Sequence, residues 1–122
     1  MAILSSVSFY PCSDIERTTR FYCEILGLKL FQDQGSCRIF DTGYGYWGFC
    51  QYQDRIPNPK GLCLSLNCEN EADVDRFYEK LKDRCCVLAP PAQHAKFPVY
   101  SFFVEDPDGY NVEFQKIADD QM

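Results

Sequence analysis

Hydrophobic and polar positions along the first part of the chain predict a strand, a helix and three further strands. Residues 4–11 alternate weakly and are rich in β-forming residues, which is typical of a strand. Residues 13–16 then supply an N-cap with acidic residues in the first turn, apolar residues recur at helical spacing, and Gly27 is placed as a C-cap. Turn residues that include glycines separate the next three strands, which we predict at residues 28–32, 36–41 and 46–52.

The same order of elements returns in the second half of the chain. Residues 61–67 predict a strand, and an acidic turn at Glu69 begins an amphipathic helix that runs through Leu81. Three more strands are predicted at residues 85–88, 99–105 and 110–116, with a proline-rich loop at residues 90–98. The chain therefore repeats one βαβββ pattern.

The repeat determines the expected domain organisation. A single βαβββ unit rarely buries its sheet face alone, so two such units are expected to share one structure. We therefore predict a single domain over residues 1–122. It consists of a first module at residues 1–52, a linker at 53–60 and a second module at 61–117.

Length, composition and charge limit the classes of function. The 122 residues are 46% hydrophobic and 16% aromatic, which is enough to bury one compact core. A net charge of −6 disfavours nucleic acid, because attraction to phosphates needs clustered Lys and Arg. No apolar stretch approaches the roughly 20 residues of a membrane helix, and the first residues lack the pattern of a signal peptide. We therefore expect a cytoplasmic protein that binds neither nucleic acid nor membranes.

Eight cysteines are spread along the chain without the C-x-x-C spacing of a zinc ribbon or a thioredoxin-like motif. Since a cytoplasmic protein is expected, we interpret them as thiols, most of them buried as small hydrophobic groups. Cys85 and Cys86 are adjacent, but the sequence does not indicate whether they have a redox role.

A short segment near the C-terminus carries the most specific signal. The residues Asp-Pro-Asp-Gly at 106–109 combine a preset proline, side-chain acceptors and a glycine, and so predict a hairpin that leads into a strand with Glu113. The first module adds three motifs, at residues 14–17, 21–22 and 26–28. Together these segments resemble the glyoxalase, bleomycin-resistance and extradiol-dioxygenase superfamily, the vicinal oxygen chelate proteins.

This resemblance covers essentially the whole chain and implies a fold. The expected fold is α+β, with two tandem βαβββ modules that form a curved, barrel-like mixed sheet. Members of the family usually form homodimers, so a homodimer is expected here. The resemblance leaves open whether the ligand cleft is swapped between modules of two chains or formed within one chain.

Members of this family typically hold a divalent metal with one side chain from the first and one from the last strand of each module. Carried over one position at a time, these places fall on Val7, Phe49, Leu62 and Glu113. A slip of the register at Phe49 would bring Cys50 or Gln51 there instead. Only Glu113 matches the ligand set, because Val, Phe and Leu offer no lone pair to a metal. No cofactor is therefore expected, and a divalent metal is the less favoured alternative.

Glu113 and the aromatic residues favour binding of a small molecule in the cup between the modules. A carboxylate in an apolar cup is a partner for a ligand cation, and aromatic walls hold flat or cationic molecules by stacking and cation–π attraction. Metal-free proteins that resemble the bleomycin-resistance proteins bind their ligands in this way. The candidate ligand-binding residues are Val7, Arg38, Trp47, Phe49, Leu62, Tyr100, Phe102 and Glu113.

Two other interpretations stay open. Glu113 as a general base, with a weaker contribution from His94 in the proline-rich loop, would make the protein an enzyme. It would then be a lyase or isomerase resembling glyoxalase I, or a dioxygenase, with a non-standard site. A cup filled by its own Val7, Phe49 and Leu62 would instead make it a non-catalytic scaffold. The sequence does not name a ligand or a substrate.

Overall fold

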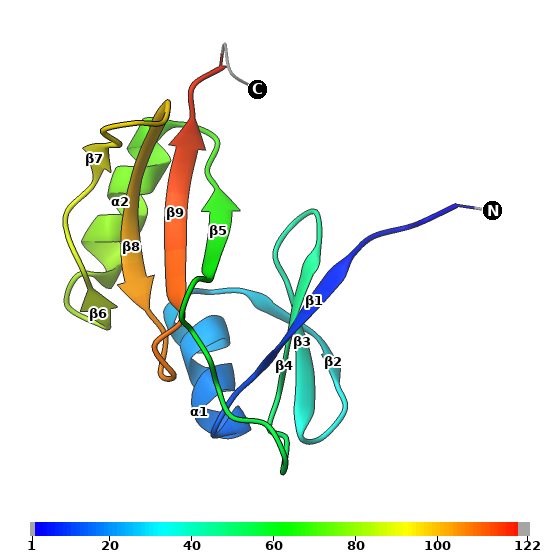
Figure 1. The fold of residues 1–122 in the computed structure, drawn as a ribbon. Coiled ribbons are helices and arrows are strands. Elements are labelled where there is room, and N and C mark those ends of the chain that lie inside the picture. Colours follow the sequence, from blue (N-terminus) through cyan, green and yellow to red (C-terminus); the bar gives the residue numbers. More distant parts are fainter. Residues whose placement is uncertain (1, 120–122) are drawn as a thin grey trace. The chain divides into compact units, whose positions relative to one another are not determined.

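Each half of the chain forms one curved, open mixed sheet against which one helical segment packs (Figure 1). The computed structural model describes residues 2–119. The chain divides into two units, with the boundary between Asn58 and Pro59. Mixed sheets with few helices confirm the predicted α+β class.

Unit 1 has the predicted βαβββ order. Its elements are β1 (Val7–Pro11), α1 (Ile15–Thr19), the π-helix η1 (Arg20–Ile25), β2 (Lys29–Asp33), β3 (Cys37–Asp41) and β4 (Tyr46–Cys50). The strand order is β1-β4-β3-β2. β1 is parallel to β4, and the other neighbours are antiparallel. The first strand of the unit therefore lies beside the last.

Unit 2 repeats this arrangement with one additional short strand. Its elements are β5 (Cys63–Asn67), α2 (Glu71–Leu81), β6 (Cys86–Val87), β7 (Ala92–Gln93), β8 (Val99–Glu105) and β9 (Asn111–Ile117). β5 is parallel to β9, which is antiparallel to β8, and β6 and β7 both pair with β8. β7 lies in the segment that we predicted as a loop. Two residues are too few to show a strand period in the sequence.

The first helix begins and ends at the residues that the sequence supplies for this purpose. The Asp14 carboxylate accepts hydrogen bonds from two backbone N–H groups of the first turn, at 3.1 and 3.2 Å. The Gln51 side-chain oxygen accepts a further bond, from the N–H of Ile15 at 2.9 Å. Gly27, at φ 84°, follows the helix in the left-handed conformation. The predicted N-cap and C-cap are both confirmed.

The turn between β8 and β9 fixes where β9 begins. The Asp106 carboxylate accepts hydrogen bonds from the N–H groups of Asp108 and Tyr110, at 2.8 and 3.0 Å. Gly109 occupies the positive-φ position at φ 88°. The predicted hairpin is therefore confirmed, and it sets the register that positions Glu113 on β9.

Aromatic rings fill the space between the helix and the sheet in unit 1. The Tyr22 ring stacks on Phe49 at 4.6 Å and on Phe40 at 5.7 Å between centroids, and all three residues are completely buried. Because side chains alternate along a strand, Phe49 and Trp47 face the helix, whereas Gly48 faces the other side. We use the name open face for the side of each sheet that is opposite to its helix.

The core of unit 2 is built in the same way. Phe114 of β9 stacks on Phe77 of α2 at 4.7 Å and on Phe102 of β8 at 5.2 Å. Tyr78 of the helix meets Phe102 edge to face at 5.6 Å. These contacts place Phe102 and Phe114 on the helix side of the sheet, so Glu113, next to Phe114 on β9, lies on the open face.

The cysteines differ from expectation. Cys37 on β3 and Cys50 on β4 are joined by a disulfide. The expectation that the cysteines remain thiols is therefore wrong for this pair, because the sequence alone does not show that the two positions face each other across neighbouring strands. Cys85 and Cys86 are not joined to each other, and Cys86, like Cys63, is exposed.

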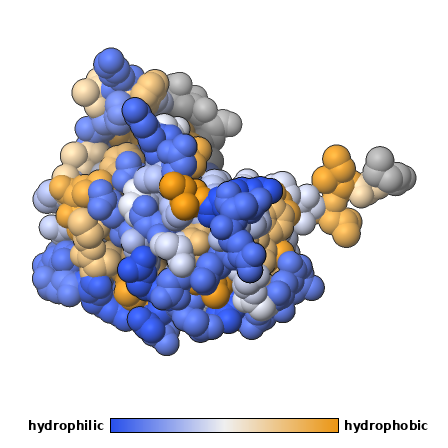
Figure 2. Space-filling view, turned by 60° about the horizontal axis from the view of Figure 1, so that its bottom comes forward, coloured by the Kyte–Doolittle hydropathy of each residue, from blue (hydrophilic) through white to orange (hydrophobic). Residues whose placement is uncertain are grey.

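One face of the molecule is mainly hydrophilic (Figure 2). Figure 2 shows a face on which hydrophobic residues lie in separate groups among more numerous hydrophilic ones. The large apolar side chains that are exposed include Val7, Phe9 and Phe31 of unit 1. None of the helices within residues 2–119 is long and apolar enough to cross a membrane.

The direction in which the side chains of β4 point predicts that replacing two phenylalanines of this sheet lowers the stability by different amounts. Phe49→Ala is expected to lower the free energy of unfolding by about 3–5 kcal/mol, because the ring is fully buried against Tyr22. Phe9→Ala, which removes a ring that is 48% exposed on the open face, should cost much less. Urea unfolding followed by circular dichroism measures both. Equal losses would contradict the assignment of the two faces.

A hydrogen bond between β8 and α2 predicts a change of stability at high pH. The Tyr100 hydroxyl donates to the Asp75 carboxylate at 2.5 Å, and this bond raises the pKa of Tyr100 from 10.0 to about 12. Because the protonated form is favoured in the folded state, its contribution is fully present below pH 10.0 and is lost as the pH rises towards 12. Over this pH range the free energy of unfolding should therefore decrease less in Tyr100→Phe than in the wild type. Tyr44→Phe, a change at an exposed tyrosine, should behave as the wild type.

Candidate functional site

The open face of unit 2 is polar and is built from β5, β8 and β9. Glu113 of β9 is level with Ser65 of β5 on one side and with Phe103 of β8 on the other. Because strand residues two apart share a face, the polar residues that accompany Glu113 are Cys63, Ser65, Asn67, Ser101, Glu105, Asn111 and Gln115. The Gln115 amide donates to Asn67 at 2.9 Å. This face therefore combines a carboxylate with hydrogen-bonding side chains.

Glu113 is buried, with 8% of its surface exposed. The Ser65 hydroxyl donates to its Oε1 at 2.6 Å, and the Cys63 thiol donates to the same oxygen at 3.8 Å. No Lys, Arg or His among residues 2–119 forms an ion pair with it. A buried carboxylate with only neutral donors is costly and gains from a positive partner.

Cys63 occupies the place on the first strand of unit 2 that we had assigned to Leu62. β5 begins at Cys63, which is level with Asn111, whereas Leu62 precedes the strand and donates its N–H to the Pro59 carbonyl at 3.2 Å. The assignment of Leu62 is therefore off by one residue. The sequence did contain the correcting signal, because Cys63 precedes the helix N-cap Asn70 by seven residues, as Val7 precedes Asp14.

Cys63 acts as a neutral donor in this arrangement. Burial raises the pKa of its thiol, and the Glu113 carboxylate raises it further, while the hydrogen bond with Ser65 lowers it. The protonated thiol can thus donate to Glu113. The sequence analysis missed both Cys63 and Ser65, which donate to Glu113.

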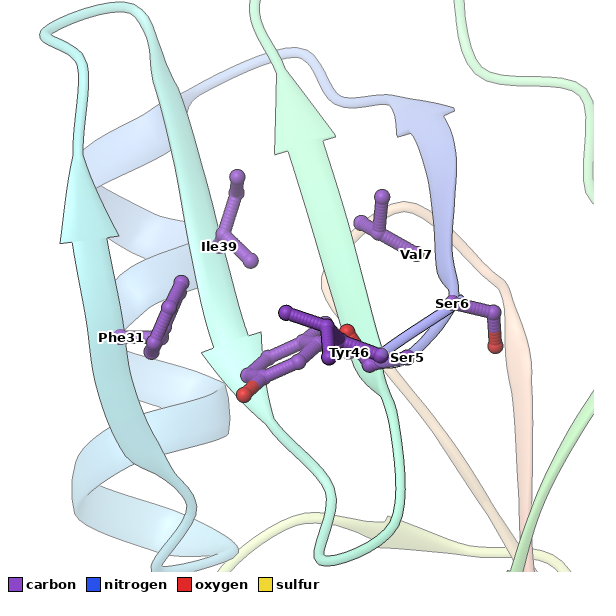
Figure 3. A pocket seen from close by; sticks show the side chains of 7 residues that line it. Ser5, Ser6, Val7, Phe31, Ile39 and Tyr46 are labelled. Atoms are coloured by element: carbon purple, nitrogen blue, oxygen red, sulfur yellow. The ribbon is translucent and has the colours of Figure 1, made fainter. Parts of the chain in front are cut away.

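The open face of unit 1 is apolar at the corresponding place. Val7 is 42% exposed and lines a pocket of about 350 Å³ together with Phe31, Ile39, Tyr46 and residues 4–6. Figure 3 shows the labelled side chains of Val7, Phe31, Ile39 and Tyr46, which are carried by β1, β2, β3 and β4, with Ser5 and Ser6 in the segment before β1. The rings of Phe31 and Tyr46 lie 4.4 Å apart. Val7 thus lies in a site of unit 1 that offers apolar contact and few polar groups.

Gly48, and not Phe49, is the residue of β4 that matches Glu113. Val7 pairs with Tyr46 of β4, and the equivalent Cys63 pairs with Asn111 of β9. Two residues after these partners come Gly48 on β4 and Glu113 on β9. A Cβ atom on Gly48 would lie 2.5 Å from two ring atoms of Phe9, so the Phe9 ring covers this position. The placement of Phe49 in the cup is wrong, because strand alternation turns its ring towards the helix.

The other aromatic candidates also lie on the helix sides of their sheets. Phe102 is 1% exposed and belongs to the core of unit 2, and the Tyr100 hydroxyl is held by Asp75 of α2. The Trp47 ring lies edge to face with Tyr22, at 6.1 Å between centroids. The structure therefore does not bring Tyr100 and Phe102 together with Glu113, nor Trp47 together with Val7.

Arg38 is held by the helix of its own unit. Its guanidinium donates to Glu16 at 2.5 Å and to the Thr19 hydroxyl at 3.1 Å, and it pairs with Asp33 at 3.3 Å. The hydrogen bond with Glu16 is the main reason that its pKa is raised. Arg38 is thus engaged in an ion-pair network and not directed to the open face of unit 1.

His94 lies in the loop between β7 and β8. Its Nδ1 accepts hydrogen bonds from the N–H groups of Lys96 and Phe97, at 2.9 and 3.2 Å, and its ring packs on Phe97 at 4.8 Å. With Ser101 and Phe103 it lines a pocket of about 270 Å³. The other lining residues include Ala92 and Gln93 of β7 and Phe102 of β8, so this pocket lies beside β7 and β8, and Glu113 does not line it.

The metal that the family typically holds does not fit the side chains present. Val7 and Gly48 of unit 1 have no side-chain atom that could bind a metal. In unit 2 the Cys63 thiol is protonated and donates a hydrogen bond to Glu113. Among residues 2–119, no group of three or more His, Cys, Asp or Glu side chains is arranged to hold a metal ion. Two donors are fewer than the three protein ligands of ordinary catalytic metal sites.

Comparison with curated proteins finds distant relatives. The chain is 25% identical to a metallothiol transferase FosB from Lysinibacillus sphaericus, a match that covers 86% of this chain and 76% of the relative. It is 28% identical to a probable lactoylglutathione lyase from Synechocystis, over 82% of this chain and 85% of the relative. These names describe the relatives.

Comparison with solved structures and with family models agrees with the fold. A glyoxalase/bleomycin resistance protein/dioxygenase from Nocardioides matches with a TM-score of 0.78 at 15% identity, over 98% of this chain and 85% of that protein. One from Alicyclobacillus acidocaldarius matches with a TM-score of 0.78 at 20% identity, over 95% and 92%. The model of the Glyoxalase/Bleomycin resistance protein/Dioxygenase superfamily matches residues 4–114. The chain belongs to this superfamily.

Proposed function

We propose that this protein binds a small, flat organic cation on the open face of unit 2, without a metal, with the Glu113 carboxylate as the charge partner. The observation that carries the proposal is the burial of Glu113 among neutral donors only. A charge removed from water without a counter-charge costs several kcal/mol. A bound cation would offset this cost.

The surroundings of Glu113 support a ligand that is both cationic and apolar. Phe103 of β8 is level with Glu113 and so presents its ring on the same face. An aromatic ring beside a carboxylate favours an organic cation, because cation–π attraction contributes about 0.5–2 kcal/mol. The net charge of −6 also attracts cations to the protein.

A binding role is better supported than the two alternatives. A scaffold with a filled site would leave no space on the open faces, whereas a pocket of about 350 Å³ lies on that of unit 1. A metal-dependent lyase, isomerase or dioxygenase would need donors at Val7 and Gly48, which have none. The activities in the names of the two relatives are therefore not carried over to this chain.

Phenyltrimethylammonium and its neutral isostere tert-butylbenzene test the proposal. Both are titrated into the ¹⁵N-labelled protein, and amide shifts are followed by NMR. We expect the cation to bind with shifts on β5, β8 and β9, and roughly tenfold more tightly than the isostere, which corresponds to about 1.4 kcal/mol. Glu113→Gln should abolish this preference, while Glu79→Gln, which removes an exposed charge on α2, should keep it.

Two outcomes would overturn the proposal. Equal preference for the cation in the wild type and in Glu113→Gln would show that Glu113 is not its partner, and absence of binding would remove the proposed ligand class. Elemental mass spectrometry of the same samples adds an independent check. A stoichiometric metal that is lost in Glu113→Gln would replace the binding role by metal-dependent chemistry. Sedimentation of these samples would also test the homodimer that the family resemblance leads us to expect.

A further inference from the structure

Cys37 and Cys50 are brought together by the sheet of unit 1. The register pairs them directly across β3 and β4, with their Cα atoms 4.0 Å apart. The N–H of Gln51 donates to the carbonyl of Ser36 at 2.8 Å, one position further along the ladder. In an antiparallel ladder the neighbouring pair then has no hydrogen bonds of its own, and its side chains approach most closely. The two sulfur atoms therefore meet because of the strand register.

The backbone around the pair holds independently of the bond between the sulfurs. The carbonyl of Cys37 accepts the N–H of Gln34 at 2.8 Å, and the carbonyl of Cys50 accepts the N–H of Cys12 at 2.9 Å. None of these bonds involves a sulfur atom. Opening the disulfide would thus leave two thiols side by side, and closing it again would need no rearrangement of the strands.

Access to the two sulfurs is unequal. Cys50 is buried, with 6% of its surface exposed, whereas Cys37 is half-buried. Thiol–disulfide exchange requires that a thiolate approach the sulfur it attacks, so access decides which cysteine reacts with an external partner. Cys37 is the cysteine that a small molecule reaches first.

We infer that Cys37 and Cys50 form a thiol–disulfide exchange site for small thiols and disulfides, in which Cys37 forms the mixed disulfide and Cys50 resolves it. This site lies in unit 1 and does not depend on ligand binding by Glu113. It is also distinct in chemistry from the neutral donor Cys63. Ile39, two residues along β3 from Cys37, lines the apolar pocket, so a molecule attached to Cys37 lies on the same face as that pocket.

The oxidising direction takes two steps. Cys37 loses its proton to solvent, and its thiolate attacks one sulfur of a small disulfide, whose S–S bond breaks and releases one small thiolate. Cys50 then loses its proton to solvent, its thiolate attacks the Cys37 sulfur, and the second small thiolate leaves as the bond between Cys37 and Cys50 forms. Each released thiolate takes up a proton from solvent. The protein is oxidised by two electrons, and the small disulfide is reduced to two thiols. The reverse sequence reduces the protein.

Several other cysteines are less suited to this reaction. Cys23, Cys63, Cys68 and Cys85 are not bonded to another cysteine, so the structure pairs none of them with a resolving thiol. Cys86 is exposed and serves as a control for simple accessibility, since its neighbour Cys85 is not bonded to it.

Oxidised glutathione is the probe for the test. The full chain is reduced, freed of reductant and mixed with the probe, and samples quenched with acid are analysed by intact mass and peptide mapping. The wild type should form the disulfide between Cys37 and Cys50. Cys50→Ser should accumulate glutathione on Cys37, roughly tenfold faster than Cys37→Ser accumulates it on Cys50. Cys86→Ser should form the internal disulfide at the wild-type rate.

The assignment has clear contradicting outcomes. A reduced wild-type protein that forms no bond between Cys37 and Cys50 would overturn the site, and equal or faster modification of Cys50 in Cys37→Ser would overturn the roles. If a serine variant does not fold, as judged by circular dichroism, early quenching of the wild type replaces it. Glutathione should then be trapped on Cys37, and trapping on Cys50 alone would contradict the inference.

Discussion

Burial of aromatic rings beneath each helix decides which side chains each sheet presents on its open face. Tyr22 stacks on Phe49 in unit 1, and Phe77 stacks on Phe114 in unit 2. Because the side-chain period of a strand is two residues, a slip of one residue would exchange the two faces completely. Because the buried rings fix the strand register, they also fix Glu113 on the open face.

The same framework carries different chemistry in its two copies. On the open face of unit 1, Val7 takes the place that Cys63 has in unit 2. The ring of Phe9 covers Gly48, which takes the place of Glu113. The family's metal site requires donors in both modules, whereas here the donors lie in unit 2. The superfamily fold is thus retained in a chain whose two sheets present different side chains on their open faces.

Local signals made much of this fold predictable from the sequence. Asp14, Gly27 and the turn at residues 106–109 have defined roles in caps and turns, and each acts as predicted. The facing of β4 was not predictable from hydrophobicity, because its residues Tyr-Trp-Gly-Phe-Cys are apolar on both sides. The disulfide between Cys37 and Cys50 depends on strand pairing, which hydrophobic periodicity does not specify.

Solvent paramagnetic relaxation of aromatic ring protons, measured by NMR with a soluble gadolinium chelate, tests the facing of both sheets most directly. The account predicts strong relaxation for Phe9 and protection for Phe49 in unit 1. In unit 2 it predicts that Phe103 is relaxed more strongly than Phe114, which is 2% exposed. Relaxation of Phe49 and Phe114 that equals or exceeds that of Phe9 and Phe103 would contradict the strand register and, with it, the placement of Glu113 on the open face.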